Sequence, residues 1–519
     1  MAEVRDVVRL GLASAGVGAG LLGFALLGPQ IGAAFADDGD GSSMSAPSAT
    51  ESGASRQAAT REGRSLVTRK HVAARAEQTA DDDTGAEPAS DERAARRAAR
   101  RTARDERVAA KIDELTSDAQ AWIDARPVSD ARKDRLERGL TTVRRTLFNQ
   151  APEVSPVQIT GVVDGPITGT VGGADPDGDR IVYRVATRPE TGSVTVNRDG
   201  SYTYTPGADF TGVDTFTVTA RDIGSNINLL NWFRPAGTTA GMLVNQGAIR
   251  FEFRYEDGAE NWTPDRRAAL DRVADNITEY LRVTAPVALV YRVEGENDPA
   301  ERWLAGANSS LVSDDPGFWR TVVQNKIISG IDANGDADDG LIAWNFAFPT
   351  AVGDVVTGDD FDFTSIVMHE LMHSFGIIGH FGPPGTNATR RNWSIWDSLM
   401  ASADGTTLVG DDYAWPESAD HYVLGADGGV LFSGANAVAA YGGKLVPVYS
   451  PSTWEPGSSG SHLDTDTFTG DDYQLMNHRI KTRGAQGIRE LSPIEMGILR
   501  DLGYLVVPPT LPSTANRGS

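Results

Sequence analysis

The stretch FDFTSIVMHELMHSFGIIGH, residues 361–380, decides how the second half of this chain is interpreted. It contains an HExxH pattern formed by His369, Glu370 and His373. On a helix, positions four apart share a face, so both imidazoles can bind one tetrahedral Zn²⁺ at about 2.0–2.1 Å. Glu370 lies beside that face and can take a proton from a zinc-activated water and return it to a leaving amine. The pattern therefore predicts metal-assisted hydrolysis.

Two downstream residues extend the pattern to HExxHxxGxxH. Gly376 allows the helix to stop and the chain to turn sharply, because it lacks a Cβ. His380 follows at the position of a third ligand. A bare HExxH occurs by chance on ordinary helices, so these additions make the signal much more specific.

The complete pattern resembles that of the metzincin zinc metalloproteases. A later segment, GSSGSHLDTDTFTGDDYQLMNHR (residues 457–479), resembles their leishmanolysin-like branch and its bacterial relatives, and the resemblance covers roughly residues 245–507. It implies an α/β catalytic domain and a methionine turn at Met476 that packs beneath the metal. Met400 is a rival that lacks a downstream helix. The third ligand stays open between His462, which the leishmanolysin pattern favours, and His380.

The remainder of the proposed metzincin domain, residues 240–507, fits an α/β layer. The segments GAIRFEFRY, TPDRRAALDRVADNITEYL and APVALVYRV predict a β-α-β unit with Thr263 as helix N-cap. Near the end, Ser492 and Glu495 have capping-box spacing. By resemblance, residues 339–349 (DGLIAWNFAFP) form the strand that borders the cleft and pairs with an extended substrate.

The N-terminal third has a different composition. Arg5, Arg9 and an apolar run that ends in Ala34-Phe35-Ala36 predict a signal peptide over residues 1–36, with an uncleaved membrane anchor as the alternative. We expect a disordered linker over 37–90, a helical spacer or pro-segment over 91–150, and a disordered tail over 508–519.

Residues 151–224 alternate apolar and polar side chains between Asp-Gly and Pro-Gly turns, which predicts an all-β sandwich. Its sequence resembles bacterial cadherin-like, immunoglobulin-like repeats. Two acidic loops could each hold structural Ca²⁺ or form a plain polar turn. The candidate ligands are Asp175, Asp177 and Asp179 in the first loop, and Asp332, Asn334, Asp336 and Asp338 in the second.

Composition excludes several classes of function. The 519 residues include no cysteine, so a disulfide framework, a thiolate metal site and a cysteine nucleophile are ruled out. A formal net charge of -23 argues against nucleic-acid binding. The chain is long enough for several domains.

Together these features predict a multidomain, secreted or cell-surface zinc metalloendopeptidase that acts on polypeptide substrates. The β-sandwich could bind a surface or extracellular partner, and no oligomeric state follows from the sequence. The main alternative is a catalytically inactive adhesion or scaffold protein with a protease-like domain. A thermolysin-type site with Glu417 as ligand is disfavoured by Gly376 and the methionine turn.

Overall fold

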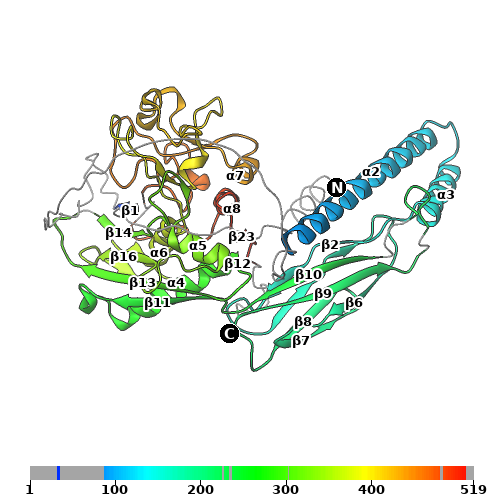
Figure 1. Cartoon of the computed structure of the whole chain (residues 1–519), viewed down its shortest axis with the longest axis horizontal. Helices are drawn as coiled ribbons and strands as arrows, with labels where there is room; N and C mark the ends of the chain where they lie inside the picture. The colour runs from blue at the N-terminus through cyan, green and yellow to red at the C-terminus, as the bar shows by residue number, and fades with distance from the viewer. Residues whose placement is uncertain are drawn as a thin grey trace, which may run out of the picture.

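A computed structural model of the chain describes residues 32–35, 87–224, 227–232, 237–301, 303–479 and 483–509. Three parts follow one another along the chain: a helical hairpin, a β-sandwich and a larger mixed α/β part (Figure 1). The predicted signal peptide, apart from residues 32–35, lies outside the described residues, as do most of the linker and most of the tail. None of the described helices has the length and apolar character needed to cross a bilayer.

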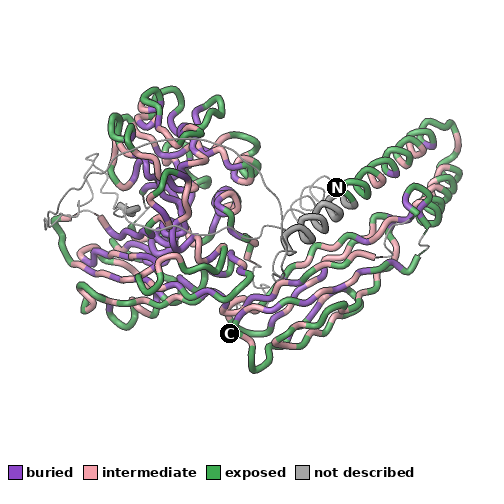
Figure 2. Tube along the Cα trace, viewed as in Figure 1, coloured by how far each residue is buried: buried purple, intermediate pink, exposed green. Residues whose placement is uncertain are grey.

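The helical hairpin consists of α2 (Glu87–Asp124) and α3 (Asp130–Leu147), which pack against each other. Where burial is described continuously, from residue 103 onward, most residues of the hairpin are exposed (Figure 2). These two helices occupy most of the segment, residues 91–150, that was predicted to be a helical spacer or pro-segment. The predicted boundary was wrong, because α2 begins at Glu87, inside the segment expected to be a linker.

The β-sandwich has two antiparallel sheets. The first contains, in order, β3 (Val157–Thr160), β4 (Ile167–Thr170), β8 (Ser201–Pro206) and β7 (Gly192–Val196). The second contains β10 (Thr238–Asn245), β9 (Val213–Asp222) and β6 (Ile181–Thr187). A short pair, β2 (Glu153–Val154) and β5 (Gly173–Ala174), completes the unit.

Alternating residues of these strands fill the space between the sheets. Tyr202 and Tyr204 of β8 meet Phe216 and Val218 of β9 in one buried cluster. Strand β10 pairs with β9 along its whole length, from Thr238 to Asn245. The predicted start of the catalytic domain at residue 240 is therefore corrected, because the sandwich extends to Asn245.

The α/β part begins with the predicted β-α-β unit. Strand β11 (Ile249–Tyr255) leads to helix α4 (Pro264–Thr278) and then to β13 (Val287–Glu296), which pairs with β11 in parallel. The sheet continues with β16 (Gly340–Asn345), parallel to β13, and with β14 (Trp303–Asn308), antiparallel to β16.

The edge of this sheet differs from the prediction. Strand β16 was expected to border the cleft, but it is paired on both sides and lies inside the sheet. The neighbouring β14 is followed at the edge by β1 (Gly32–Phe35), which runs antiparallel to it. The chain forms β14 before β16, and β16 then inserts between β13 and β14. The residue pattern of one strand does not show which strands lie on either side of it.

Helix α6 (Phe363–Ser374) crosses the sheet, and α5 (Val322–Ser329) packs near β13. After α6 the chain forms mostly short pieces, drawn in yellow to red in Figure 1. This later segment contains the α-helices α7 (Ala435–Ala440) and α8 (Pro493–Asp501) and a small sheet of β20 (Met400–Ala401), β21 (Leu431–Phe432) and β22 (Val446–Pro447). Two of its strands pair with strands that precede α6: β19 (Asn392–Ser394) with β15 (Gly317–Trp319), and β23 (Leu505–Val506) with β12 (Leu281–Arg282). Just before α6, β17 (Thr350–Ala351) pairs with β18 (Phe361–Asp362).

One hydrophobic core joins the sheet to this irregular region. It includes Trp344 of β16, Phe363 of α6, Trp396, Met476 and Ile498 of α8. Figure 2 shows the buried residues concentrated around α6. The long segment after α6 is therefore part of the same folded unit and holds side chains against that helix.

Candidate metal centre

Helix α6 is fixed at its start by Asp362. The Asp362 carboxylate accepts hydrogen bonds from Thr364 N and Ser365 N, at 3.1 and 3.5 Å, and so caps the first turn. It is also bound by Arg489, whose Nε lies 2.8 Å from Oδ2 and whose Nη2 lies 2.8 Å from Oδ1. Every residue of α6 is buried. The helix is thus held in one position by the C-terminal segment.

Three imidazoles meet at one point on this helix. His369 and His373 lie one turn apart, and their Nε2 atoms are 3.1 Å from each other. His462 reaches the same place from the irregular region, with its Nε2 at 3.1 Å from that of His369 and 3.2 Å from that of His373. All three are at most 3 % exposed.

The other ring nitrogen of each histidine is bound to a backbone carbonyl. Nδ1 lies 2.7 Å from Leu475 O in His369, 2.7 Å from Ile377 O in His373, and 2.9 Å from Ser458 O in His462. A carbonyl oxygen only accepts, so each Nδ1 carries the hydrogen and each neutral ring keeps an acceptor lone pair on Nε2. The three lone pairs therefore face one another.

Burial keeps these rings neutral. It lowers the pKa of His369 to about 4 and, together with the nearby charge of His369, that of His373 to about 3. Burial and the two neighbouring imidazoles hold the pKa of His462 well below its ordinary value. At neutral pH no proton on Nε2 relieves the mutual repulsion of the lone pairs.

This donor set fits a metal ion. A tetrahedral centre with Zn–N bonds of about 2.0–2.1 Å places its nitrogens roughly 3.3–3.4 Å apart, close to the spacing of these three Nε2 atoms. A cation between them would turn the repulsion into binding. Across the described ranges, this is the one group of three or more His, Asp or Glu residues whose ligand atoms gather tightly enough for a metal.

Glu370 follows the first of these histidines and is 1 % exposed. It lies in α6 directly after His369, and it is not one of the three residues whose ligand atoms converge. The sequence pattern assigned this residue the role of base.

His380 does not join the cluster. Its Nδ1 lies 3.5 Å from Asp397 Oδ2, and its backbone N–H donates to Asp397 Oδ1 at 2.9 Å. Gly376, with φ of 101°, turns the chain directly after α6. Of the two candidate third ligands, the structure places His462 with His369 and His373, and His380 against a buried carboxylate.

The segment around Met476 passes next to this cluster. Met476 is fully buried, and its carbonyl accepts from Leu463 N at 2.8 Å, next to His462. The preceding Leu475 supplies the carbonyl that binds His369. Met400, the rival, lies in β20 and pairs with Phe432.

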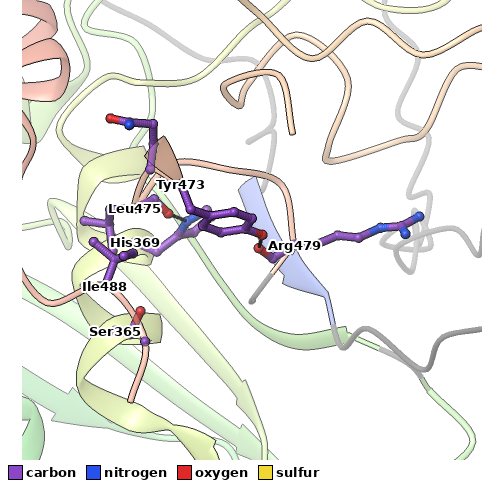
Figure 3. Close-up of a pocket in the computed structure, with 8 residues that line it drawn as sticks. Ser365, His369, Tyr473, Leu475, Arg479 and Ile488 are labelled. Carbon is purple, nitrogen blue, oxygen red and sulfur yellow. Dashed lines mark hydrogen bonds between the residues drawn. The ribbon is translucent and has the colours of Figure 1, made fainter. Parts of the chain in front are cut away.

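A shallow pocket opens beside His369, between α6 and the segment that contains Tyr473 and Leu475 (Figure 3). The Tyr473 hydroxyl donates to the carbonyl of Arg479, while the Arg479 side chain extends away from the pocket. Strand β1 contacts α6, the helix that lines one side of this pocket.

Four groups that shape the centre were not predicted from the sequence. The carbonyls of Ile377, Ser458 and Leu475 leave no signal in the sequence, because every residue has a carbonyl. Glu495 was recognised only as a helix cap, yet its Oε1 accepts from Met476 N at 2.8 Å. Its capping-box spacing was the only available clue.

The two acidic loops are occupied by protein donors. Arg144 Nε lies 2.7 Å from Asp177 Oδ1, Arg145 Nε lies 2.9 Å from Asp179 Oδ1, and Asp175 Oδ1 accepts from two backbone N–H groups of its own loop. In the second loop, Asp332 forms an ion pair with Lys326, and Asp338 forms one with Arg254. Asn334 Nδ2 donates to two carbonyls of its own loop, and Asp336 is exposed. The polar-turn alternative accounts for these contacts, and calcium binding stays a prediction.

The comparison with known proteins identifies a family match for the β-sandwich. Residues 149–228 match the family model of the bacterial cadherin-like domain, which supports the predicted cadherin-like part and is compatible with an extracellular or surface protein. The match begins slightly before and ends slightly after the predicted limits of 151 and 224. No curated protein matches the chain.

Proposed function

We propose that this protein is a secreted zinc-dependent endopeptidase, with a metzincin-type catalytic domain behind its cadherin-like domain. The observation that carries the proposal is the convergence of three neutral Nε2 acceptors, from His369, His373 and His462, with no donor between them. Such a group is repulsive without a cation and matches the nitrogen donors that Zn²⁺ prefers. When bound, Zn²⁺ supplies Lewis acidity and lowers the pKa of water to about 7.

The residues of the chain supply the remaining chemistry. The three Nδ1–carbonyl bonds hold the rings in one tautomer and orientation, so His369, His373 and His462 would be the residues that hold the ion through Nε2. Glu370, buried next to His369, takes a proton from the attacking water and delivers it to the leaving amine. The reaction cleaves a peptide bond by direct addition of water and needs no nucleophilic side chain.

The sheet edge favours a polypeptide substrate. Strand β1 lies antiparallel on β14, where Ala34 is opposite Ala305, and it also contacts α6. An extended peptide that took the place of β1 on β14 would form the same backbone hydrogen bonds. These bonds do not depend on the identity of the peptide's side chains. Selectivity then comes from pockets such as the one beside His369.

An inactive adhesion or scaffold protein is the second candidate, because a cadherin-like domain is also what such a protein would contain. The two candidates differ at Glu370. A scaffold does not require a buried carboxylate beside three histidines, and burying one without a role in binding or chemistry has a cost in stability.

The test combines zinc content with proteolysis of a denatured protein mixture. We expect wild type to bind one zinc and to cleave, and Glu370→Gln to bind zinc equally but to lose activity by at least about 10²-fold. His462→Ala should lose zinc, whereas His380→Ala should retain it. A zinc-loaded wild type that cleaves nothing would support the scaffold, and a His380→Ala protein without zinc would contradict the ligand assignment.

A further inference from the structure

One buried carboxylate outside the histidine cluster contacts the backbone beside it. Glu495, in the first turn of α8, is fully buried. Its Oε1 accepts from Met476 N and its Oε2 from Ser492 N, each at 2.8 Å. Burial raises the pKa of this carboxyl above its ordinary value, and hydrogen bonds from the backbone of Ser492, Met476 and Leu475 oppose that rise only in part.

The two contacts of the Leu475–Met476 peptide group link Glu495 to His369. The N–H of Met476 and the C=O of Leu475 belong to the same planar, trans peptide unit and point in opposite directions. On one side the N–H donates to Glu495, and on the other side the C=O accepts from His369 Nδ1 at 2.7 Å. A carboxyl oxygen that accepts from the N–H polarises the unit and makes the oxygen of its C=O a stronger acceptor.

His369 needs such an anchor more than the other two histidines. The carbonyl partners of His373 and His462 lie only four residues away, at Ile377 and Ser458, and are positioned by local chain geometry. The partner of His369 lies 106 residues away. Its orientation therefore depends on whatever holds the Leu475–Met476 peptide in place.

We infer that Glu495 is a positioning residue of the metal centre: it fixes and polarises the Leu475–Met476 peptide so that this peptide orients His369 Nε2 toward the other two imidazoles. The inference rests on the proposed function, because it takes the three histidines as zinc ligands. It assigns to helix α8 a role in metal affinity in addition to its place in the core.

Zinc affinity in a set of variants tests the inference. Glu495→Ala removes both contacts, and Glu495→Gln keeps the shape but places an N–H group against one backbone donor. Ser492→Ala is the matched control, because it breaks the same capping box, in which Ser492 Oγ accepts from Glu495 N at 3.1 Å, and leaves the Met476 contact intact. Competition with a chelator gives the Kd, and the visible spectrum of the Co²⁺-loaded protein reports the geometry of the ligands.

We expect both Glu495 variants to raise the Kd for zinc by about 10–100-fold and to alter the Co²⁺ spectrum, with Ser492→Ala within about threefold of wild type. Unchanged Kd and spectrum in folded Glu495 variants would overturn the inference. Unfolding of both Glu495 variants but not of Ser492→Ala would also overturn it, because Glu495 would then act on stability alone. A wild type that binds no zinc would instead refute the proposed function.

Discussion

His478, two residues after Met476, is a buried histidine that the proposed metal centre does not use. It is 5 % exposed, its ring stacks on Tyr449 with centroids 3.5 Å apart, and its Nδ1 lies 2.7 Å from Thr465 Oγ1. Burial, together with the charges of Arg479 and His369, lowers the pKa of His478 to about 3. The folded protein thus keeps this ring neutral at pH values where the unfolded chain protonates it.

We expect this ring to make stability depend on pH. Above the ordinary pKa of 6.5 its contribution is fully present, and it is lost as pH falls from 6.5 toward about 3, because only the unfolded state binds the proton. In urea unfolding of the zinc-free protein at several pH values in this window, His478→Gln should reduce the slope by about 1.4 kcal/mol per pH unit. Parallel slopes for wild type and variant would contradict the assignment.

The site residues divide into those that the sequence could predict and those that it could not. The places of His369, Glu370 and His373 on one helix follow from spacing, because helix geometry alone decides which neighbours share a face. The choice between His462 and His380 depends on where the segment after α6 returns, which is decided by packing of Trp396, Met476 and their neighbours in the core. That packing leaves no signal in the sequence, and only the resemblance of residues 457–479 to the leishmanolysin-like pattern favoured His462.

At the scale of the element, α6 depends on the ion pair at its start. The Asp362 carboxylate has no exposed surface, the Arg489 side chain is 15 % exposed, and Gly487 N also donates to Asp362 Oδ2 at 2.8 Å. This pair joins α6, which carries two of the proposed ligands, to the C-terminal segment. It is sufficiently buried that removing one partner should lower the free energy of unfolding substantially.

We expect Asp362→Ala to destabilise the protein by about 3–5 kcal/mol, because it removes a helix cap and leaves the largely buried Arg489 guanidinium with only the exposed Asp354 and the Gly353 carbonyl as partners. Thr263→Ala, which removes the side-chain cap of α4, is the control and should cost only about 1 kcal/mol. Chemical denaturation measures both. Equal losses in the two variants would show that the Arg489 pair adds nothing to the cap.

Helix caps were predicted from the sequence more accurately than the pairing of strands. The caps Thr263 and Ser492 form as predicted, since capping needs only residues three apart. The edge position of residues 339–349 was wrong and the start of the α/β part was placed too early, because both depend on which distant strands pair. Strand β10 resembles any half-buried strand in sequence, and only its register with β9 assigns it to the sandwich.

At the scale of the whole molecule, charged contacts attach the helical hairpin to the sandwich. Arg144 of α3 binds Asp177, whose side chain has no exposed surface and whose Oδ2 also accepts from Gln150 N. Arg145 binds Asp179 in the same loop. The loop considered as a calcium site therefore serves as the contact surface for α3.

We expect Asp177→Ala to speed amide hydrogen exchange in α3 by about tenfold or more, since it leaves Arg144 without its buried partner. Asp113→Ala removes only the exposed partner of Arg144 and should change exchange by less than about threefold. Millimolar Ca²⁺ should have no effect on wild type. Faster exchange in α3 on addition of Ca²⁺ would instead favour a cation in this loop.

The separation of the three imidazoles along the chain has a consequence for folding. His369 and His462 are 93 residues apart, so a metal held by both closes a large loop in a chain that has no cysteine for a covalent cross-link. In the loop-entropy model, a cross-link over about a hundred residues stabilises the native state by on the order of 4–5 kcal/mol at 25 °C. Zinc would then stabilise the fold as a disulfide cross-link does. Removing it with a chelator would shorten the lifetime of the folded protein and also abolish peptide-bond hydrolysis.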